Sequence, residues 1–402
     1  IEGKVGESST KYYNVDSETK TGLPEKKEDG HIDAEIVQSW SPAKKGELIK
    51  HNELNSFVQV LNQNPDLYVS PVVSRGDDPN TMNIEYQFYE RRPWHILAQI
   101  DNSGSEERQW DPVIGLTTTN LTGRNDTATI FYQGGLFEEP SQAFKDNYSV
   151  FASYKFPFFT PYLQNRVYYG YSQFDSDSQA ISDLLFRGEG EIYGTEFILN
   201  LFSAGEWMLD AKAGISSEKS YINRVFGNSS IGIDTDIDLE MLGGGLVLYR
   251  DQGLNKTRVE VGVDYNYDGS SEEEFDKARR RAEPDFSILS VNFNHDQFFG
   301  ESKIHRLKTD FEYIYSSDRL VSSKMSTFGG FNSVRGYEED EIVADGGYNA
   351  SLQYELDLLG FMNYRKDSED EKVKSDKFSR IALAGFADYG KPDFVDPIAG
   401  ED

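Results

Sequence analysis

Residues 259–267 read Val-Glu-Val-Gly-Val-Asp-Tyr-Asn-Tyr, and this alternation decides the fold. Successive side chains of a β-strand point to opposite sides, so every second residue shares a face. One face of this segment is apolar and ends in aromatic residues, and the other is polar. That combination is what a transmembrane barrel strand requires, with aromatic residues at the membrane interface. The apolar face carries Val259, Val261, Val263, Tyr265 and Tyr267.

The same pattern recurs from about Trp94 onward in segments of roughly ten residues, broken by Gly, Asn, Asp and Ser. The clearest examples are residues 148–156, 167–171, 207–215, 307–315 and 381–389. Lipid offers the backbone no hydrogen bonds, so such strands must close into a barrel. A soluble β-sandwich or propeller also alternates. The aromatic ends and the alternation of short with long connections favour the membrane barrel.

Counting segments from Trp94 predicts about thirteen strands. Arg335 then falls in the loop after the eleventh strand, and Asp388 lies on the thirteenth. Bacterial single-chain barrels have even strand numbers. We therefore expect residues 93–402 to form a barrel that is truncated at its C-terminal end, with about three strands missing.

Residues 31–92 predict a small α+β unit. Residues 31–37 alternate like a strand, residues 50–62 have helical spacing, and a strand pair follows at 68–74 and 82–89. Residues 1–30 are polar and are interpreted as a linker or the tail of a preceding domain. The predicted helix presents four apolar residues as candidate partner contacts, although packing of the domain core is their competing role. These are Leu54, Phe57, Val58 and Leu61.

Composition excludes several functions. The chain has 402 residues, no cysteine and a formal net charge of −29, which argues against nucleic acid as a partner because phosphate binding needs a basic surface. No segment has the length and apolarity of a transmembrane helix, and the first residues do not resemble a signal peptide. The five histidines lack zinc-like spacing. No P-loop or nucleophile–base pair is present, so we predict no catalysis, no cofactor and no metal.

Two short motifs near the end of the chain supply one cation and one anion. The first is Val334-Arg335-Gly336-Tyr337 and the second is Phe386-Ala387-Asp388-Tyr389-Gly390. Every second residue of a strand points to the same side, so Phe386, Asp388 and Gly390 share one face. The other apolar residues of the segment are on the other face, and we expect the face with Asp388 to point to the barrel interior. Arginine presents a planar fork suited to a carboxylate. Gly336 and Gly390 would let the loop approach the strand closely.

Taken together, these segments resemble the TpsB transporters of two-partner secretion, the ShlB, FhaC and HecB kind of hemolysin secretion/activation protein. The resemblance covers residues 31–390 and includes the segments 91–94, 100–105 and 120–126. Residues 45–48, 61–65 and 75–81 are similar to the second POTRA domain of that family. The two short motifs belong to the wider superfamily, which includes BamA-type insertases.

The resemblance implies a mainly β protein, with a periplasmic α+β POTRA domain followed by a transmembrane antiparallel β-barrel of sixteen strands in full length. It implies that Arg335 pairs with Asp388 to latch a loop inside the barrel. The expected function is an outer-membrane pore that receives an unfolded, secreted TpsA-like partner at the POTRA domain and translocates it. Outer-membrane lipid surrounds the expected monomeric barrel.

Two alternatives stay open at this point. The first is a BamA- or TamA-like insertase of the same superfamily, which would assemble outer-membrane proteins. The second is a passive porin or surface receptor, against which the α+β unit argues because a simple pore does not need one.

Overall fold

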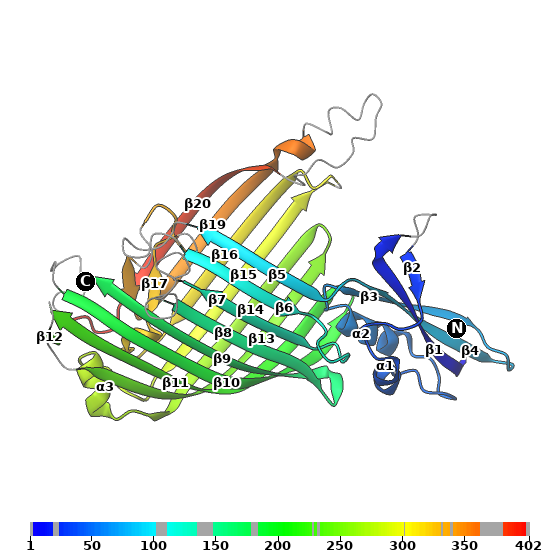
Figure 1. The fold of residues 1–402 in the computed structure, drawn as a ribbon, viewed down its shortest axis with the longest axis horizontal. Coiled ribbons are helices and arrows are strands. Elements are labelled where there is room, and N and C mark those ends of the chain that lie inside the picture. Colours follow the sequence, from blue (N-terminus) through cyan, green and yellow to red (C-terminus); the bar gives the residue numbers. More distant parts are fainter. Residues whose placement is uncertain are drawn as a thin grey trace. The chain divides into compact units, whose positions relative to one another are not determined.

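The computed structural model describes residues 3–18, 24–101, 111–134, 148–177, 184–226, 229–230, 234–300, 302–330, 333–337, 341–361 and 381–398. These residues form a four-stranded N-terminal sheet, a large sheet and a two-stranded ribbon (Figure 1). The chain folds as two compact units, the first mainly Ile1–Asp101, Asp111–Phe174 and Glu191–Ala204, the second mainly Gly205–Asp402. Within the part described, no helix is both long and apolar enough to cross a membrane.

The N-terminal sheet has the strand order β2-β1-β4-β3. Its strands are β1 (Lys4–Glu18), β2 (Pro24–Lys27), β3 (Leu67–Arg75) and β4 (Thr81–Glu90). β1 runs parallel to β4, and the other pairs are antiparallel. Two helices, α1 (Ala34–Trp40) and α2 (His51–Leu61), lie between β2 and β3 in the chain. The side chain of Asp33 caps α1 by accepting a hydrogen bond from the backbone N–H of Glu35.

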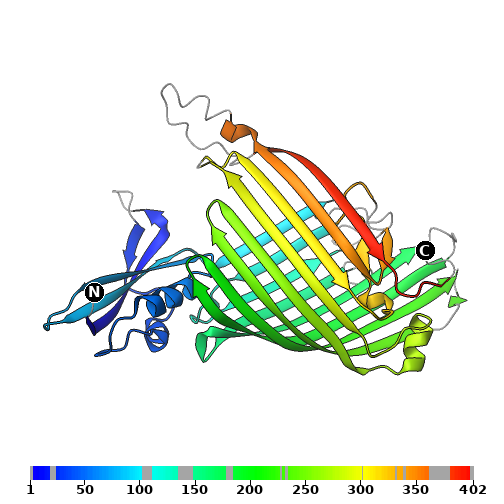
Figure 2. The same ribbon diagram turned by 180° about the vertical axis from the view of Figure 1, so that it is seen from behind.

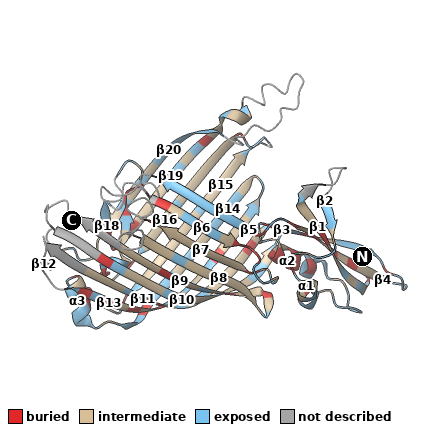
Figure 3. Ribbon diagram, in the orientation of Figure 1, coloured by how far each residue is buried: buried red, intermediate tan, exposed pale blue. Residues whose placement is uncertain are grey.

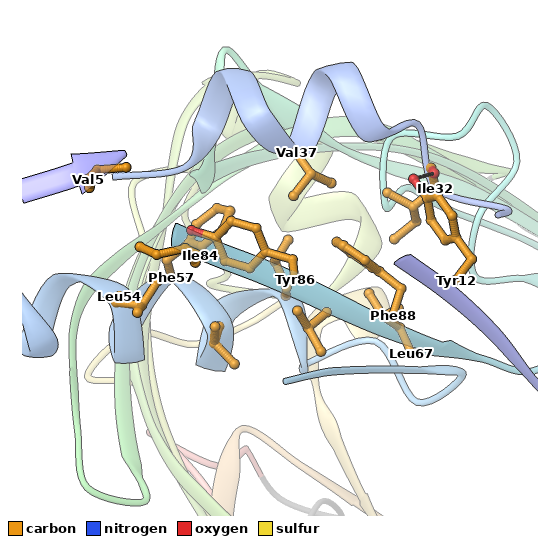
Figure 4. Close-up of a cluster of buried hydrophobic side chains, with 13 residues drawn as sticks. Val5, Tyr12, Ile32, Val37, Leu54, Phe57, Leu67, Ile84, Tyr86 and Phe88 are labelled. Carbon is orange, nitrogen blue, oxygen red and sulfur yellow. Dashed lines mark hydrogen bonds between the residues drawn. The ribbon is translucent and has the colours of Figure 1, made fainter. Parts of the chain in front are cut away.

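One apolar core joins the two helices to this sheet (Figure 4). The ring of Phe57 on α2 lies edge-on to that of Tyr86 on β4, with centroids 5.7 Å apart. Tyr12 on β1 donates its hydroxyl to the carbonyl oxygen of Ile32 at 2.8 Å. The helix predicted over residues 50–62 and the strands predicted at 68–74 and 82–89 are confirmed by α2, β3 and β4.

Two predictions for the N-terminal region are wrong. Residues 1–30 are not a linker, because β1 pairs with β4 from Lys4 to Asn14 and contributes Val5 and Tyr12 to the core. Most of β1 is polar, so its strand character is not visible in hydrophobicity alone. Residues 31–37 do not form a strand but lead into α1. Ala34 and Val37, one helical turn apart, both pack on the core.

Among the described residues, the large sheet has fourteen strands, thirteen of them on one continuous path from β5 to β20. The prediction of about thirteen strands is thereby confirmed. Long connections alternate with short ones, as in residues 270–286 against 253–254. The strands of the path are β5 (Trp94–Asp101), β6 (Asp111–Thr118), β7 (Thr127–Gln133), β8 (Tyr148–Phe158), β9 (Thr160–Asp177), β10 (Leu184–Ala204), β11 (Trp207–Phe226), β13 (Thr235–Gln252), β14 (Asn255–Gly269), β15 (Ser287–Phe299), β16 (His305–Tyr315), β19 (Gly346–Asp357) and β20 (Ala382–Asp393).

The remaining elements lie in connections or beside the path. β12 (Ser229–Ser230) pairs with β11, and α3 (Glu272–Ala278) lies between β14 and β15 in the chain. The connection from β16 to β19 carries η1 (Ser322–Lys324) and a ribbon of β17 (Ser326–Phe328) with β18 (Ile342–Ala344). Figure 2 shows β19 and β20, orange and red, side by side at one end of the strand order.

The strand register in the second unit places apolar side chains together on one face. Leu246, Val261, Val291 and Tyr313 lie opposite one another across β13, β14, β15 and β16. Leu246 is 48% exposed and Val261 is 39% exposed, so this face is not a protein core (Figure 3). An extended apolar surface of this kind needs an apolar surrounding, and lipid provides one.

The opposite face of the same strands carries ion pairs. Lys212 on β11 binds Glu260 on β14 at 2.6 Å, and Arg258 binds the same carboxylate at 2.7 Å. Lys212 reaches across β13 at Gly245, its register partner, where there is no side chain to block it. We call this the polar face, and it is the face on which the candidate site lies.

Candidate functional site

The candidate site joins a loop to the last strand of the path. Arg335 lies in the connection from β16, the eleventh strand of the path, to β19, the twelfth. Asp388 lies on β20, the thirteenth. Gly336, the next residue in the loop, has φ of 101°, a conformation that favours glycine. We call residues 316–345 the Arg335 loop.

Arg335 binds Asp388 through both its side chain and its backbone. Its Nε donates to Oδ2 at 2.7 Å and its Nη2 to Oδ1 at 2.6 Å, which is the bidentate fork arrangement. The backbone N–H of Arg335 also donates to Oδ2 at 3.0 Å. The side chain of Asp388 is 2% exposed and that of Arg335 is 17% exposed. The hydrogen bond from Arg335 to Asp388 raises the pKa of this loop arginine, so it stays charged at every physiological pH.

Phe386 and Gly390 complete the contact from the same face of β20. The guanidinium carbon of Arg335 lies 3.7 Å from the centroid of the Phe386 ring, a stacked cation–π contact. A Cβ placed on Gly390 would lie 2.7 Å from Cγ2 of Val334, too close for any real contact. The absence of a side chain at Gly390 therefore makes room for the loop residue that precedes Arg335.

A Cβ on Gly336 would meet nothing within 4 Å, so the prediction that this glycine permits a close approach to the strand is wrong. Tyr337 also does not join this contact. Its side chain is 58% exposed, and its backbone N–H donates to the carbonyl oxygen of Val334 at 3.4 Å. The structure thus brings together Val334, Arg335, Phe386, Asp388 and Gly390, and leaves the Tyr337 side chain at the surface. Whether the assembled contact works as a latch stays a prediction.

β19 supplies further partners that the sequence analysis missed. Ser351 receives a hydrogen bond from Nη2 of Arg335 at 2.9 Å and donates to Oδ1 of Asp388 at 2.8 Å. Gln353 accepts from Nη1 of Arg335 through Oε1. In the register, Ser351 lies opposite Asp388 and Gln353 opposite Phe386. This pairing is the only signal that points to them, and it becomes visible once β19 and β20 are aligned.

Polar contacts continue from the site along the polar face. Gln353 donates to Glu355 at 2.8 Å, and Glu355 lies 3.5 Å from Nη1 of Arg306. Arg306 in turn binds Asp296 on β15 at 2.5 Å. This series of hydrogen bonds and ion pairs links Arg335 to β20, β19, β16 and β15.

The four apolar residues of α2 occupy the N-terminal core. Leu54, Phe57, Val58 and Leu61 are 4%, 0%, 9% and 0% exposed. Their burial leaves almost no side-chain surface for a partner, so the structure does not support the predicted contact role. The competing role in core packing is the one they have, because the apolar side of α2 faces the sheet.

The turn between β6 and β7, residues 119–126, ties the first strands of the large sheet to the N-terminal region. Asp126 is fully buried and accepts hydrogen bonds from the backbone of Thr122 and the hydroxyl of Tyr154. Asn120 donates to the carbonyl oxygen of His31 at 2.6 Å. The sequence segment 100–105 that accompanies this turn in the resemblance lies mostly outside the described residues.

Among the residues that the structure describes, no group of three or more His, Asp or Glu side chains is arranged to hold a metal ion.

A long antiparallel sheet with one lipid-compatible and one charged face, and a loop bound to that charged face, defines a protein of the outer-membrane β-barrel class. The chain belongs to the haemolysin secretion/activation protein family ShlB/FhaC/HecB, whose family model matches residues 81–358. The family is that of the TpsB transporters of two-partner secretion, as the resemblance implied.

Solved structures share this fold. CdiB from Escherichia coli is similar over 98% of this chain and 73% of its own, with 14% identity and a TM-score of 0.69. CdiB from Acinetobacter baumannii is similar over 99% and 65%, with 13% identity and a TM-score of 0.68. BamA from Haemophilus ducreyi lacking POTRA domains 1–3 is similar over 99% and 82%, with 12% identity and a TM-score of 0.54. No curated protein matches the chain in sequence.

Proposed function

We propose that this chain exports a secreted partner polypeptide through its barrel and that the Arg335 loop is the part that moves to open the path. The observation that carries the proposal is the attachment of the loop to β20. Only non-covalent contacts on the polar face hold Arg335 to Asp388, Ser351 and Phe386. Such contacts can be broken and remade without any change to the strands.

The resting state is the latched one. Asp388 is nearly buried and receives three hydrogen bonds from Arg335. A hydrogen bond to a charged group contributes about 1.5–3 kcal/mol, and these bonds favour the latched state against the entropy cost of ordering the loop. At about 3 kcal/mol, less than about 1% of molecules would be open without a partner. The arriving polypeptide then supplies the free energy that opens the loop.

The N-terminal α+β region acts as a periplasmic POTRA domain that receives the partner. β3 is at the edge of its sheet, with one neighbour among the described strands. Tyr68 and Val73 on β3 are 60% and 46% exposed. An unfolded chain can add to such an edge through main-chain hydrogen bonds. Binding at the β3 edge replaces the contact role predicted for the buried side of α2.

The remaining parts of the proposal follow from this mechanism. Export by loop movement involves no covalent step, so the chain is a pore and not an enzyme, and it needs no cofactor. The half-exposed apolar face lies in outer-membrane lipid around a monomeric barrel. The physiological ligand is the secreted partner protein alone.

Replacement of either partner in the latch tests the function. Arg335→Ala leaves Asp388 without its main counter-charge, and Asp388→Ala does the converse, so we expect each to lower export about tenfold or more. Export of the partner is measured in cells, and heat-modifiable migration of the barrel reports correct insertion. Glu273→Ala, which breaks the exposed pair with Lys277 on α3, is the matched control.

Normal export by both Arg335→Ala and Asp388→Ala, with normal insertion, would remove the loop from the mechanism.

A further inference from the structure

A second ion pair fixes the Arg335 loop at its stem, and it is more deeply buried than the pair at the tip. Arg279, which follows α3, binds Asp345 through both terminal nitrogens, with Nη2 at 3.0 Å from Oδ2. The side chains are 8% and 1% exposed, against 17% and 2% for Arg335 and Asp388. Both pairs therefore have a buried carboxylate, but only the stem pair also has a buried arginine.

The carboxylate of Asp345 binds three separate chain segments. Its Oδ1 also accepts from the backbone N–H of Leu320 at 2.8 Å, and its Oδ2 from that of Val395 at 2.9 Å. Arg279 donates to the carbonyl oxygen of Leu320 at 2.7 Å. Leu320 lies near the start of the Arg335 loop, Asp345 ends it, and Val395 follows β20. One ion pair thus joins both ends of the loop to its neighbours.

Arg319 adds to this junction and is 4% exposed. Its Nε donates to the carbonyl oxygen of Arg280 at 2.8 Å, and its Nη1 to those of Val395 and Asp396 at 3.2 and 3.1 Å. Each of these three acceptors is a backbone carbonyl, so through these hydrogen bonds Arg319 joins the loop to two other chain segments.

An apolar cluster packs beside the junction. Leu320 and Val321 from the loop, with Phe275 on α3, are at most 1% exposed. They pack with Ile237, Leu239 and Met241 of β13, whose side chains have the parity of the polar face. Figure 1 shows α3 beside β13 at this end of the sheet. The cluster resists separation of the stem from the strands because separation would expose its apolar surface to water.

Stem and tip are therefore held differently. The stem has a buried ion pair, backbone hydrogen bonds and an apolar cluster. The tip has the Arg335 pair, the Phe386 ring and the neighbouring polar side chains of β19. Between them lie β17 and β18, a ribbon of three residues per strand. Breaking an ion pair costs more when both of its charges are buried than when one of them is partly hydrated.

We propose that Arg279, acting through Asp345, is a positioning residue that keeps the stem of the Arg335 loop stationary while the tip swings. Opening is then a hinge motion of the part beyond the stem, and the loop never leaves as a whole. The proposal rests on the proposed function, in which the loop moves. It explains why the loop can release Asp388 and still return to it, since the stem holds Arg335 within reach.

Pulsed electron paramagnetic resonance on the full-length protein tests this, because the sequence has no cysteine to remove. Nitroxides are attached to Ser302→Cys as the reference in the β15–β16 turn, with Tyr337→Cys for the tip or Ser317→Cys for the stem. Arg335→Ala should broaden the tip distance and leave the stem distance narrow. Arg279→Gln should broaden both, although Arg335 and Asp388 are unchanged.

Ion conductance in planar bilayers gives a readout that a merely structural role would not move. Arg279→Gln should raise the potassium chloride conductance per folded channel, because a loose stem misplaces the tip. Arg279→Lys keeps the charge and should restore part of the closed state. Lys324→Ala, which breaks the mostly buried pair between this loop residue and Glu218 on β11, is the control and should leave the stem distance unchanged.

Two results would overturn the proposal. One is an unchanged stem distance in both Arg279→Gln and Asp345→Asn. The other is a stem distance that broadens as much in Arg335→Ala as it does in Arg279→Gln. If Asp345→Asn does not fold, Arg279→Lys and Arg279→Gln still decide the matter. Normal export by Arg335→Ala alongside the expected distances would overturn the proposed function and leave the stem anchor standing.

Discussion

At the residue scale, three positions of β20 meet two residues of the loop, Arg335 and Val334. Phe386 stacks under the guanidinium, Asp388 binds it, and Gly390 leaves space for Val334. They alternate along one strand, so they share the polar face. The charge pair provides most of the attraction, while Gly390 decides whether the loop can come close enough for it to form.

Gly390→Val tests the role of space separately from charge. The new side chain would overlap Val334, so the loop should sit away from β20 and export should fall as in Arg335→Ala, with Asp388 intact. Gly385→Val is the matched control, because a Cβ on Gly385 of the same strand meets nothing within 4 Å. Export and insertion are measured for both. Equal export by the two variants would contradict this account of Gly390.

The parity of β20 was enough to predict from sequence that Phe386, Asp388 and Gly390 share a face. Ser351 and Gln353 could not be predicted, because their role depends on the register between β19 and β20. Residues 358–381 separate these strands, and a connection of that length does not fix a register the way a tight turn does. The α2 residues were misassigned as candidate contacts because the sequence pattern of an apolar helix face is the same whether that face packs in the core or binds a partner.

At the element scale, the strands of the large sheet and the N-terminal elements α2, β3 and β4 were predictable, whereas β1 and α1 were not. β11 and β14 contain the alternating segments 207–215 and 259–267 that predicted them. β1 is polar over most of its length, and only Val5 and Tyr12 mark its buried side. α1 has seven residues, which is too few to distinguish helical from strand periodicity. Tertiary packing, not local pattern, decides both elements.

Tyr12 makes the contribution of β1 measurable through pH. Burial raises the pKa of its phenol to about 12 from the ordinary 10.0. The fold therefore favours the protonated phenol, whose contribution to stability is complete below pH 10 and is lost as the pH rises through about 12. The melting temperature of the N-terminal region is compared at about pH 9 and about pH 11.5, a range chosen around the phenol pKa. Over this range it should fall less in Tyr12→Phe than in the wild-type protein.

The Tyr12→Phe protein lacks the hydrogen bond to Ile32 at every pH. Its melting temperature should therefore already be lower than that of the wild-type protein at about pH 9, by the amount that the loss of one hydrogen bond causes. Circular dichroism of the full-length protein follows the transition. An identical alkaline fall in the two proteins would mean that Tyr12 does not titrate against the fold.

At the scale of the whole molecule, the two faces of the large sheet define two environments. Leu246 represents the apolar face, and Asn292 represents the polar one, where the register places it opposite Glu260 and Glu312. Strand number and facial parity were both predictable from sequence, because they follow from alternation alone. The stem anchor at Arg279 and Asp345 was not, since its members come from connections 66 residues apart.

Leu246→Lys should destabilise the barrel in lipid vesicles by about 2–4 kcal/mol if the position lies near the bilayer midplane, and less toward the interface. Asn292→Lys, with the same new side chain, should cost little because two carboxylates lie opposite it in the register. Denaturant unfolding in vesicles measures both. A similar loss in the two variants would contradict the assignment of the faces.

The central claim is that export requires the Arg335 loop to leave β20, and a disulfide between the two tests it most directly. Val334 and Gly390 are close enough for a bridge, and the sequence contains no other cysteine. In the double variant Val334→Cys, Gly390→Cys, the first change removes the Cγ2 methyl that a Cβ on Gly390 would meet, so the reduced protein keeps room for the loop. Oxidation should stop export of the partner, and a reductant should restore it to the level of Val334→Cys alone, which exports under both conditions. Undiminished export by the fully cross-linked protein would contradict the account.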